Sequence, residues 1–157
     1  MNKKRFSKTH HKHGLIGEDF ALNWFRRLGY GGAKPECQYG ADLFLDHPKW
    51  GITPVEVERR YAKSWANGLF PYDTYNLPDR RYAKAKTSLL VVLSFDMDRA
   101  LLVFPMSVLG ADLSNLWVTK DNRHVKGERV LEVPVELCRD VSTSDPSVRI
   151  DTLPHEY

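Results

Sequence analysis

Apolar residues at helical spacing mark one helix near the start of the chain. Its apolar positions recur every four residues: Ile16, Phe20, Trp24 and Leu28. This spacing places them in one stripe along a helix, which can then pack against a core. Gly29 follows the stripe, and a glycine at that position is typical of the left-handed cap that ends a helix. We therefore expect a helix over residues 14–28.

Alternating polar and apolar residues predict several strands farther along the chain. The expected strands are residues 41–46, 53–59, 88–95, 99–105, 116–120 and 129–135. Turn-forming residues at 47–51 join the first two into a hairpin, and residues 96–98 join the next two. Residues 60–78 are expected to be irregular, and residues 79–86 to form a helical turn. A helix followed by a mixed or antiparallel sheet of five or six strands predicts a domain of the α+β or mixed α/β class.

The length of 157 residues fits a single domain with its own core. Residues 1–13 lack apolar periodicity and are expected to form a flexible basic arm, residues 14–138 the folded domain, and residues 139–157 a polar C-terminal tail. The two cysteines, Cys37 and Cys138, stand in no metal-ligand spacing, which argues against a disulfide framework and a cysteine-type zinc site.

No hydrophobic segment of the sequence suits a membrane or a signal peptide. The longest apolar run is strand-sized, far below the roughly 20 residues that span a bilayer, and no apolar segment follows the polar N-terminus. We therefore expect a cytoplasmic protein without a membrane partner.

The net charge of +3 is unevenly distributed along the chain. Residues 1–13 contain five lysines and arginines and no acid, and residues 59–86 contain seven against two acids. Basic segments beside an acidic remainder are typical of a protein that binds a polyanion such as DNA. They are also common on solvated surfaces, so charge alone leaves both interpretations open. The candidates for contact with nucleic-acid phosphates are Arg59, Arg60, Arg80, Arg81, Lys84 and Lys86.

Three acidic residues of the first predicted hairpin are expected to share one face of the sheet. Glu56 and Glu58 are two residues apart, so in a strand they point to the same side, about 7 Å apart. Asp42 lies on the neighbouring strand. Like charges gathered on a sheet repel, and Mg²⁺ would remove that penalty while keeping sites for water and phosphate oxygens. The acids therefore predict a metal site suited to phosphodiester hydrolysis; an exposed hairpin with alternating acids is the alternative.

The two segments Gly40-Ala41-Asp42 and Val55-Glu56-Val57-Glu58, separated by a turn, resemble the active-site hairpin of the PD-(D/E)xK nuclease superfamily. This superfamily includes restriction endonucleases and archaeal-type Holliday junction resolvases. The preceding helix, from Gly17-Glu18 to Leu28-Gly29-Tyr30, resembles the first helix of the family, and the resemblance spans residues 14–105. It implies a restriction-endonuclease-like fold, which is a mixed central sheet flanked by helices.

The resemblance also implies roles for individual residues. Asp42, Glu56 and the backbone carbonyl of Val57 would bind Mg²⁺ or Mn²⁺. Glu58 stands where the family usually has lysine; some restriction enzymes with glutamate there are active, and degenerate members that have lost the lysine also exist. In an active enzyme Glu58 would position the attacking water or bind a second metal, and Arg60 could supply some of the missing positive charge.

Glu18 lies at the edge of the apolar stripe of the predicted helix. One interpretation is a fourth acid that supports the metal cluster, as in resolvase-like members of the superfamily. The other is an acid that complements the dipole at the N-terminus of the helix.

Together these features predict a metal-dependent nuclease of the endonuclease or resolvase type that hydrolyses DNA, including branched or structured DNA. Its catalytic residues would be Asp42, Glu56, Glu58 and Glu18. A homodimer is compatible with this activity, since nucleases that cut both strands usually pair two sites. The alternative is a catalytically inactive protein of the same fold that binds nucleic acid or a protein partner. A third interpretation is a protein-interaction module without nucleic acid.

Overall fold

The computed structural model describes residues 8–36, 40–60, 65, 69–109, 112–121 and 126–150. The expectations for residues 1–7 and 151–157 lie outside these ranges. The helices and strands, in chain order, are α1 (Lys8–Arg27), β1 (Gly31–Ala33), β2 (Leu43–His47), β3 (Gly51–Arg59), β4 (Thr74–Pro78), α2 (Asp79–Ala85), β5 (Leu89–Leu93), β6 (Arg99–Val103), η1 (Ser114–Leu116), β7 (Trp117–Lys120), β8 (Glu128–Pro134), η2 (Val135–Leu137) and β9 (Arg139–Ser142).

A six-stranded mixed sheet forms the centre of the fold, with the strand order β1-β2-β3-β5-β6-β9. Strands β2 and β3 form the predicted antiparallel hairpin, in which Leu43 pairs with Val55. Strand β3 also pairs in parallel with β5, whereas β5 and β6 form the second predicted hairpin. The parallel pair requires a crossover between β3 and β5, because parallel strands cannot be joined by a tight turn.

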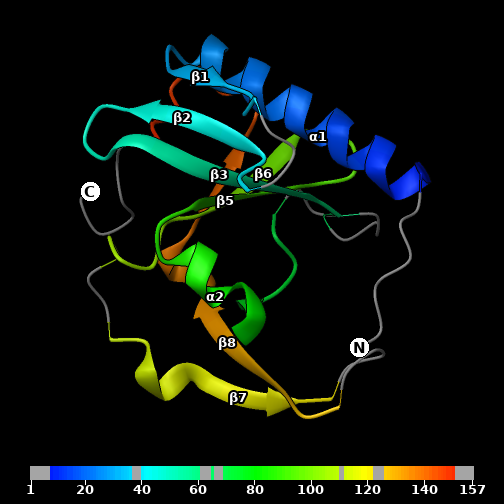
Figure 1. Ribbon diagram of the computed structural model, residues 1–157, viewed down its shortest axis with the longest axis vertical. Coiled ribbons are helices and arrows are strands. Elements are labelled where there is room, and N and C mark those ends of the chain that lie inside the picture. Colours follow the sequence, from blue (N-terminus) through cyan, green and yellow to red (C-terminus); the bar gives the residue numbers. More distant parts are fainter. Residues whose placement is uncertain are drawn as a thin grey trace.

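The two helices lie on opposite faces of the central sheet. Helix α1 packs along β3, β1 and β2 (Figure 1), and a Cβ added at Gly17 would lie 3.5 Å from Val57 and 3.7 Å from Leu93. Successive side chains of a strand alternate between faces, so Glu56 and its partner Leu90 face the other side, where they line a cavity together with α2. The expected fold class, a mixed central sheet flanked by helices, is confirmed.

The core lies mainly beneath α1 and around β5 and β6. Every residue of β5 is buried, as expected of a strand that is covered on both faces. Trp24 and Phe25 of α1 are almost completely buried and stack with their ring centroids 5.6 Å apart. The predicted stripe is only partly the buried face of the helix. Trp24 is buried, whereas Ile16 is exposed and Leu28 is half-buried. Residues beside the stripe, Ala21 and Phe25, are completely buried, so the face that packs on the sheet is displaced by about one residue from the predicted one.

Strands β4, β8 and β7 form a separate three-stranded sheet (Figure 1). The expectation of one sheet that includes the two late strands is therefore wrong, and so is the expectation that residues 74–78 are irregular. Strand β4 is short and ends in Pro78, so its own sequence signals it weakly. It exists because Tyr75 and Leu77, both buried, pair with Val133 and Leu131 of β8, more than fifty residues away.

Helix α1 begins at Lys8, earlier than expected, so residues 8–13 belong to the helix and not to a flexible arm. Gly14 lies inside the helix at an exposed position. A single glycine in a helix costs about 1 kcal/mol and need not end it. The expected end of the helix is confirmed, because Gly29 has a φ of 92°, in the left-handed region.

Residues 139–150 belong to the fold, so the expectation of a tail from residue 139 is wrong. Strand β9 pairs with β6 at the edge of the central sheet, and Val148 and Ile150 are buried. The Ile150 N–H donates a hydrogen bond to the Tyr30 hydroxyl at 3.0 Å. The segment is polar on average, and only its few apolar residues become buried, through contacts with distant parts of the chain. No helix in the described part of the chain is long and apolar enough to cross a membrane.

Candidate functional site

Asp42 is held at the entry of the β2–β3 hairpin. It immediately precedes β2, and the pairing of Leu43 with Val55 places it opposite the end of β3 where Glu56 lies. Its Oδ2 atom accepts a hydrogen bond of 2.9 Å from the Val57 N–H. The register of the hairpin therefore fixes the position of this carboxylate.

Glu56 lies beside Asp42 on the face of the sheet opposite α1, across a cavity from α2. Its side chain is 15% exposed. Burial and the neighbouring Asp42 carboxylate raise the pKa of Glu56, and the Lys84 ammonium opposes this shift. Its Oε1 atom lies 3.6 Å from Lys84 Nζ, which reaches across from α2. Glu56 is thus placed between a carboxylate and an ammonium group.

Glu18 reaches the same carboxylate from α1. Its carboxyl group lies close to that of Asp42, as does the carboxyl group of Glu56. Burial and Asp42 raise the pKa of Glu18 to about 7. The first turn of α1 contains no acidic residue, so Glu18 does not lie where an acid would complement the N-terminus of the helix. The structure therefore brings Glu18, Asp42 and Glu56 together, with Asp42 between the other two.

The chemistry of this group suits a hard divalent cation. Carboxyl groups this close cannot all ionise unless a proton or a cation offsets their repulsion. In the described part of the chain, no group of three or more His, Cys, Asp or Glu side chains is arranged so that it could hold a metal ion. The possible ligand set is therefore smaller, namely Asp42, Glu56 and the backbone carbonyl of Val57. One or two carboxylates are what Mg²⁺ commonly takes from a protein, with water and phosphate oxygens completing its shell.

Glu58 is engaged differently from the other three acids. Its Oε2 atom accepts a hydrogen bond of 2.6 Å from the Tyr75 hydroxyl, and burial together with Glu58 raises the pKa of Tyr75. Its Oε1 atom lies 2.9 Å from Arg60 Nε, and its Oε2 atom lies 3.9 Å from a terminal nitrogen of Arg81. Glu58 thus joins β3 to β4 and α2. Arg60 therefore lies on the same side of the strand as Glu58.

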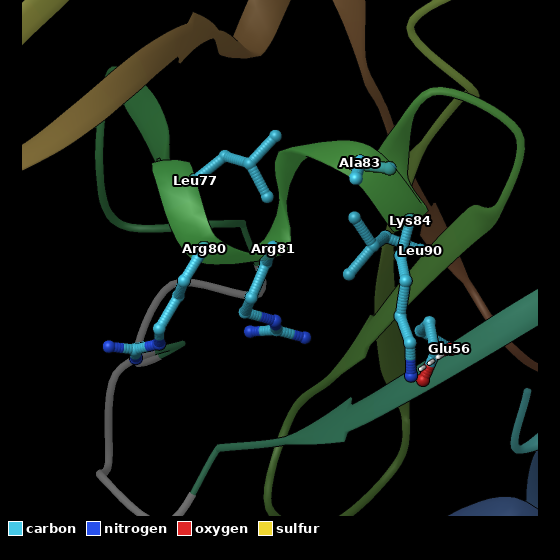
Figure 2. A pocket seen from close by; sticks show the side chains of 8 residues that line it. Glu56, Leu77, Arg80, Arg81, Ala83, Lys84 and Leu90 are labelled. Carbon is cyan, nitrogen blue, oxygen red and sulfur yellow. Dashed lines mark ion pairs between the residues drawn. The ribbon is translucent and has the colours of Figure 1, made fainter. Parts of the chain in front are cut away.

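Three basic residues of α2 line a cavity above Glu56. Arg80, Arg81 and Lys84 form one wall of a cavity of about 290 Å³, and Glu56 and Leu90 of the central sheet lie on the other side (Figure 2). Arg80 also pairs with Glu128 of β8 at 2.8 Å. We call this space the α2 cavity. The basic side chains of this cavity therefore lie next to Glu56, one of the three neighbouring acids.

The other two basic candidates lie elsewhere. Arg59 donates a hydrogen bond of 2.9 Å to the carbonyl of Phe95, and its guanidinium lies 4.6 Å from the centroid of that ring. Lys86 lies with its ammonium 5.4 Å from the centroid of the Tyr82 ring. Neither residue lines the α2 cavity.

Sequence reasoning missed two partners of the acids. Lys84 was expected only as a contact for nucleic acid, and Tyr75 lay in a segment expected to be irregular. If the resemblance holds, Glu58 at the position of the usual lysine was the signal in the sequence for a cation supplied by another residue. The sequence could not identify which one, because α2 reaches β3 only through the tertiary fold.

The raised pKa of Glu18 predicts how stability depends on pH. The pKa of Glu18 is about 7 in the folded protein and near 4.5 in the unfolded chain, so the folded state binds the proton more tightly. This contribution to stability is fully present below pH 4.5 and is lost as the pH rises through about 7. Without divalent metal, Glu18→Gln should therefore raise the Tm at pH 8. After allowance for solvent screening, we expect about 1 kcal/mol, or roughly 2–4 °C. Thermal melts at pH 4.5 and pH 8 test this, and an equal change at both would contradict it.

Comparisons with known proteins found a similarity in structure but none in sequence. No family model matches the chain, and no curated protein matches it. The chain is similar in structure to a bacterial homing endonuclease, I-Ssp6803I, with a TM-score of 0.43 and 18% sequence identity. The similarity covers 76% of this chain and 81% of the other.

Proposed function

We propose that this protein is a metal-dependent nuclease that hydrolyses phosphodiester bonds in DNA. The observation that supports this most is the contact of Asp42 with both Glu18 and Glu56, beside a cavity lined by basic residues of α2. Carboxylates suit the metal and arginines suit phosphate, and phosphodiester hydrolysis needs both at one place.

In the proposed site, Asp42 and Glu56 bind Mg²⁺ or Mn²⁺ together with the carbonyl of Val57. The hydrogen bond from the Val57 N–H orients Asp42, and Glu18 supports Asp42 from α1, so Glu18 acts as a positioning residue. When bound, the cation would neutralise charge on the phosphate and lower the pKa of a water molecule. Hydrolysis then forms a bond from a water oxygen to phosphorus and breaks one ester bond; the water loses a proton and the departing alcohol oxygen gains one.

Glu58 is proposed to hold the basic residues in place. Its contacts with Tyr75, Arg60 and Arg81 fix α2 relative to β3. Arg60, Arg80, Arg81 and Lys84 lie on or near the face of the carboxylates and would contact the DNA backbone there, whereas Arg59 and Lys86 would extend the contact surface.

A catalytically inactive protein of the same fold, which binds nucleic acid or a protein partner, is the alternative. Incubation of the purified protein with plasmid and branched DNA, in Mg²⁺, in Mn²⁺ and in a chelator, separates the two. If the protein is a nuclease, DNA should be cleaved in Mg²⁺ or Mn²⁺ and should stay intact in the chelator. The inactive protein predicts no cleavage, with DNA retention that falls steeply as salt rises if nucleic acid is its partner.

Binding of metal to this site predicts a stability change that needs no substrate. At about 100 times its Kd, Mn²⁺ should stabilise the fold by about 2.7 kcal/mol, which corresponds to a Tm increase of roughly 5–10 °C. The Asp42→Asn variant should show little of this increase, because it loses a charged ligand. Differential scanning calorimetry with and without Mn²⁺ measures the effect. An equal increase in both proteins would place the metal elsewhere.

A further inference from the structure

We propose that Lys84 of α2 supplies the catalytic cation at the scissile phosphate, and that the α2 cavity is where this phosphate sits. This inference rests on the proposed function. It assigns to a helix the positive charge that the resemblance places at position 58 of the strand, where this chain has Glu58.

The position of Lys84 carries the inference. Its ammonium lies 3.6 Å from Glu56 Oε1 and donates a hydrogen bond of 3.4 Å to the carbonyl of Gly40. Gly40 is two residues before Asp42, so Lys84 touches the segments that carry both proposed metal ligands. Figure 2 shows its side chain extending from α2 to Glu56 on β3.

The chemistry of an ammonium group fits this role. It has three N–H donors; one donates to the carbonyl of Gly40, and the ammonium also forms an ion pair with Glu56 at 3.6 Å. A third donor can therefore meet a non-bridging phosphate oxygen in the α2 cavity. As water adds to phosphorus, negative charge increases on these oxygens, and a fixed cation stabilises it. Lys84 keeps its proton throughout, so the proton balance of hydrolysis is unchanged.

The neighbouring residues explain why Lys84 differs from the arginines beside it. Arg80 is paired with Glu128, and Arg81 approaches Glu58, so neither arginine is paired with a proposed metal ligand. Lys84 is the basic residue of α2 that pairs with the proposed metal ligand Glu56. The side chain of Lys84 is 62% exposed, so its replacement should not unfold the protein.

The chain offers a matched control for this experiment. Lys120 pairs with Glu132 at 3.4 Å, again a lysine paired with a strand glutamate, but in the three-stranded sheet. The variants are Lys84→Gln, Lys84→Arg and Lys120→Gln. The measurements are the single-turnover cleavage rate of plasmid DNA at saturating protein in Mg²⁺, the Kd for DNA in Ca²⁺, and the affinity for Mn²⁺ by calorimetry.

We expect Lys84→Gln to lower the single-turnover rate by roughly a hundredfold, the size of effect seen when one transition-state donor is lost. Its Kd for DNA should change by less than about threefold, because Lys84 would be one of several residues that contact phosphate and would contribute only part of the binding free energy. Its affinity for Mn²⁺ should increase severalfold, because the ammonium no longer competes for Glu56. Lys84→Arg should recover part of the rate, and Lys120→Gln should match the parent in all three measurements.

Other results overturn the inference. If Lys84→Gln cleaves at the parent rate while Asp42→Asn does not cleave, the role of Lys84 is wrong and the proposed function stands. If the loss of rate equals the loss of DNA affinity, Lys84 is an ordinary backbone contact. A parent protein that cleaves no DNA in Mg²⁺ or Mn²⁺ overturns both proposals.

Discussion

Replacing Asp42 with asparagine is expected to lower metal-dependent DNA cleavage by at least roughly a thousandfold, since it removes charge from the centre of the proposed metal site. Asp42 is the acid that both Glu18 and Glu56 contact. Asparagine keeps an oxygen that can accept the hydrogen bond from the Val57 N–H, so the hairpin should keep its geometry. Single-turnover cleavage of plasmid DNA in Mg²⁺ measures the effect.

The same variant should keep its fold and its affinity for DNA. Where no divalent metal is bound, one fewer negative charge near the basic cavity does not weaken phosphate binding, so retention on DNA in a chelator should equal or exceed that of the parent. Asp46→Asn is the matched control, because Asp46 lies at the other end of β2 and is exposed; it should cleave within about twofold of the parent, as surface substitutions away from a site usually do. An Asp42→Asn protein that cleaves as fast as the parent would exclude Asp42 as a metal ligand.

Replacing Ile150 with alanine is expected to cause the largest loss of stability among these variants. Ile150 is completely buried. Its N–H donates to the Tyr30 hydroxyl, and its carbonyl lies 3.5 Å from His47 Nε2. Removing a buried isoleucine side chain costs about 2–5 kcal/mol, which lowers the Tm by roughly 5–15 °C in a domain of this size.

Thermal and urea unfolding of Ile150→Ala measure this loss. The adjacent Arg149→Ala is the control, because its side chain is exposed and its loss should change stability by less than about 0.5 kcal/mol. If both variants unfold like the parent, residues 139–150 contribute little to the fold and the packing of this segment on the domain is wrong.

The local elements were predictable because their signals lie within a few residues of each other. The four-residue spacing predicted α1, although the buried side of that helix is displaced by about one residue from the predicted stripe. Alternation in β2 and β3 predicted the hairpin and the shared face of its acids, and the register of the hairpin places Asp42 opposite the end of β3 where Glu56 lies. Two neighbouring strands need only a turn to meet, so the sequence alone is enough to bring these two acids together.

Contacts between distant segments were not predictable in the same way. Strands β4 and β9 are short, and each forms only because a partner strand far along the chain satisfies its backbone groups. Residues 139–150 are polar on average, and two apolar residues, Val148 and Ile150, are too few to form a periodic pattern. The sequence therefore did not indicate that these two residues are buried.

The residues of the proposed site also fall into those that the sequence predicted and those that only the tertiary structure brought together. By itself, the sequence determined the hairpin acids Asp42 and Glu56, because strand alternation and a short turn fix their relation. Only the tertiary structure decided that α1 brings Glu18 to Asp42 and that α2 brings Lys84 to Glu56. It also decided that Glu58 binds Tyr75, Arg60 and Arg81. These contacts depend on how helices pack on opposite faces of a sheet, which is set by the burial of the whole core and not by any local pattern.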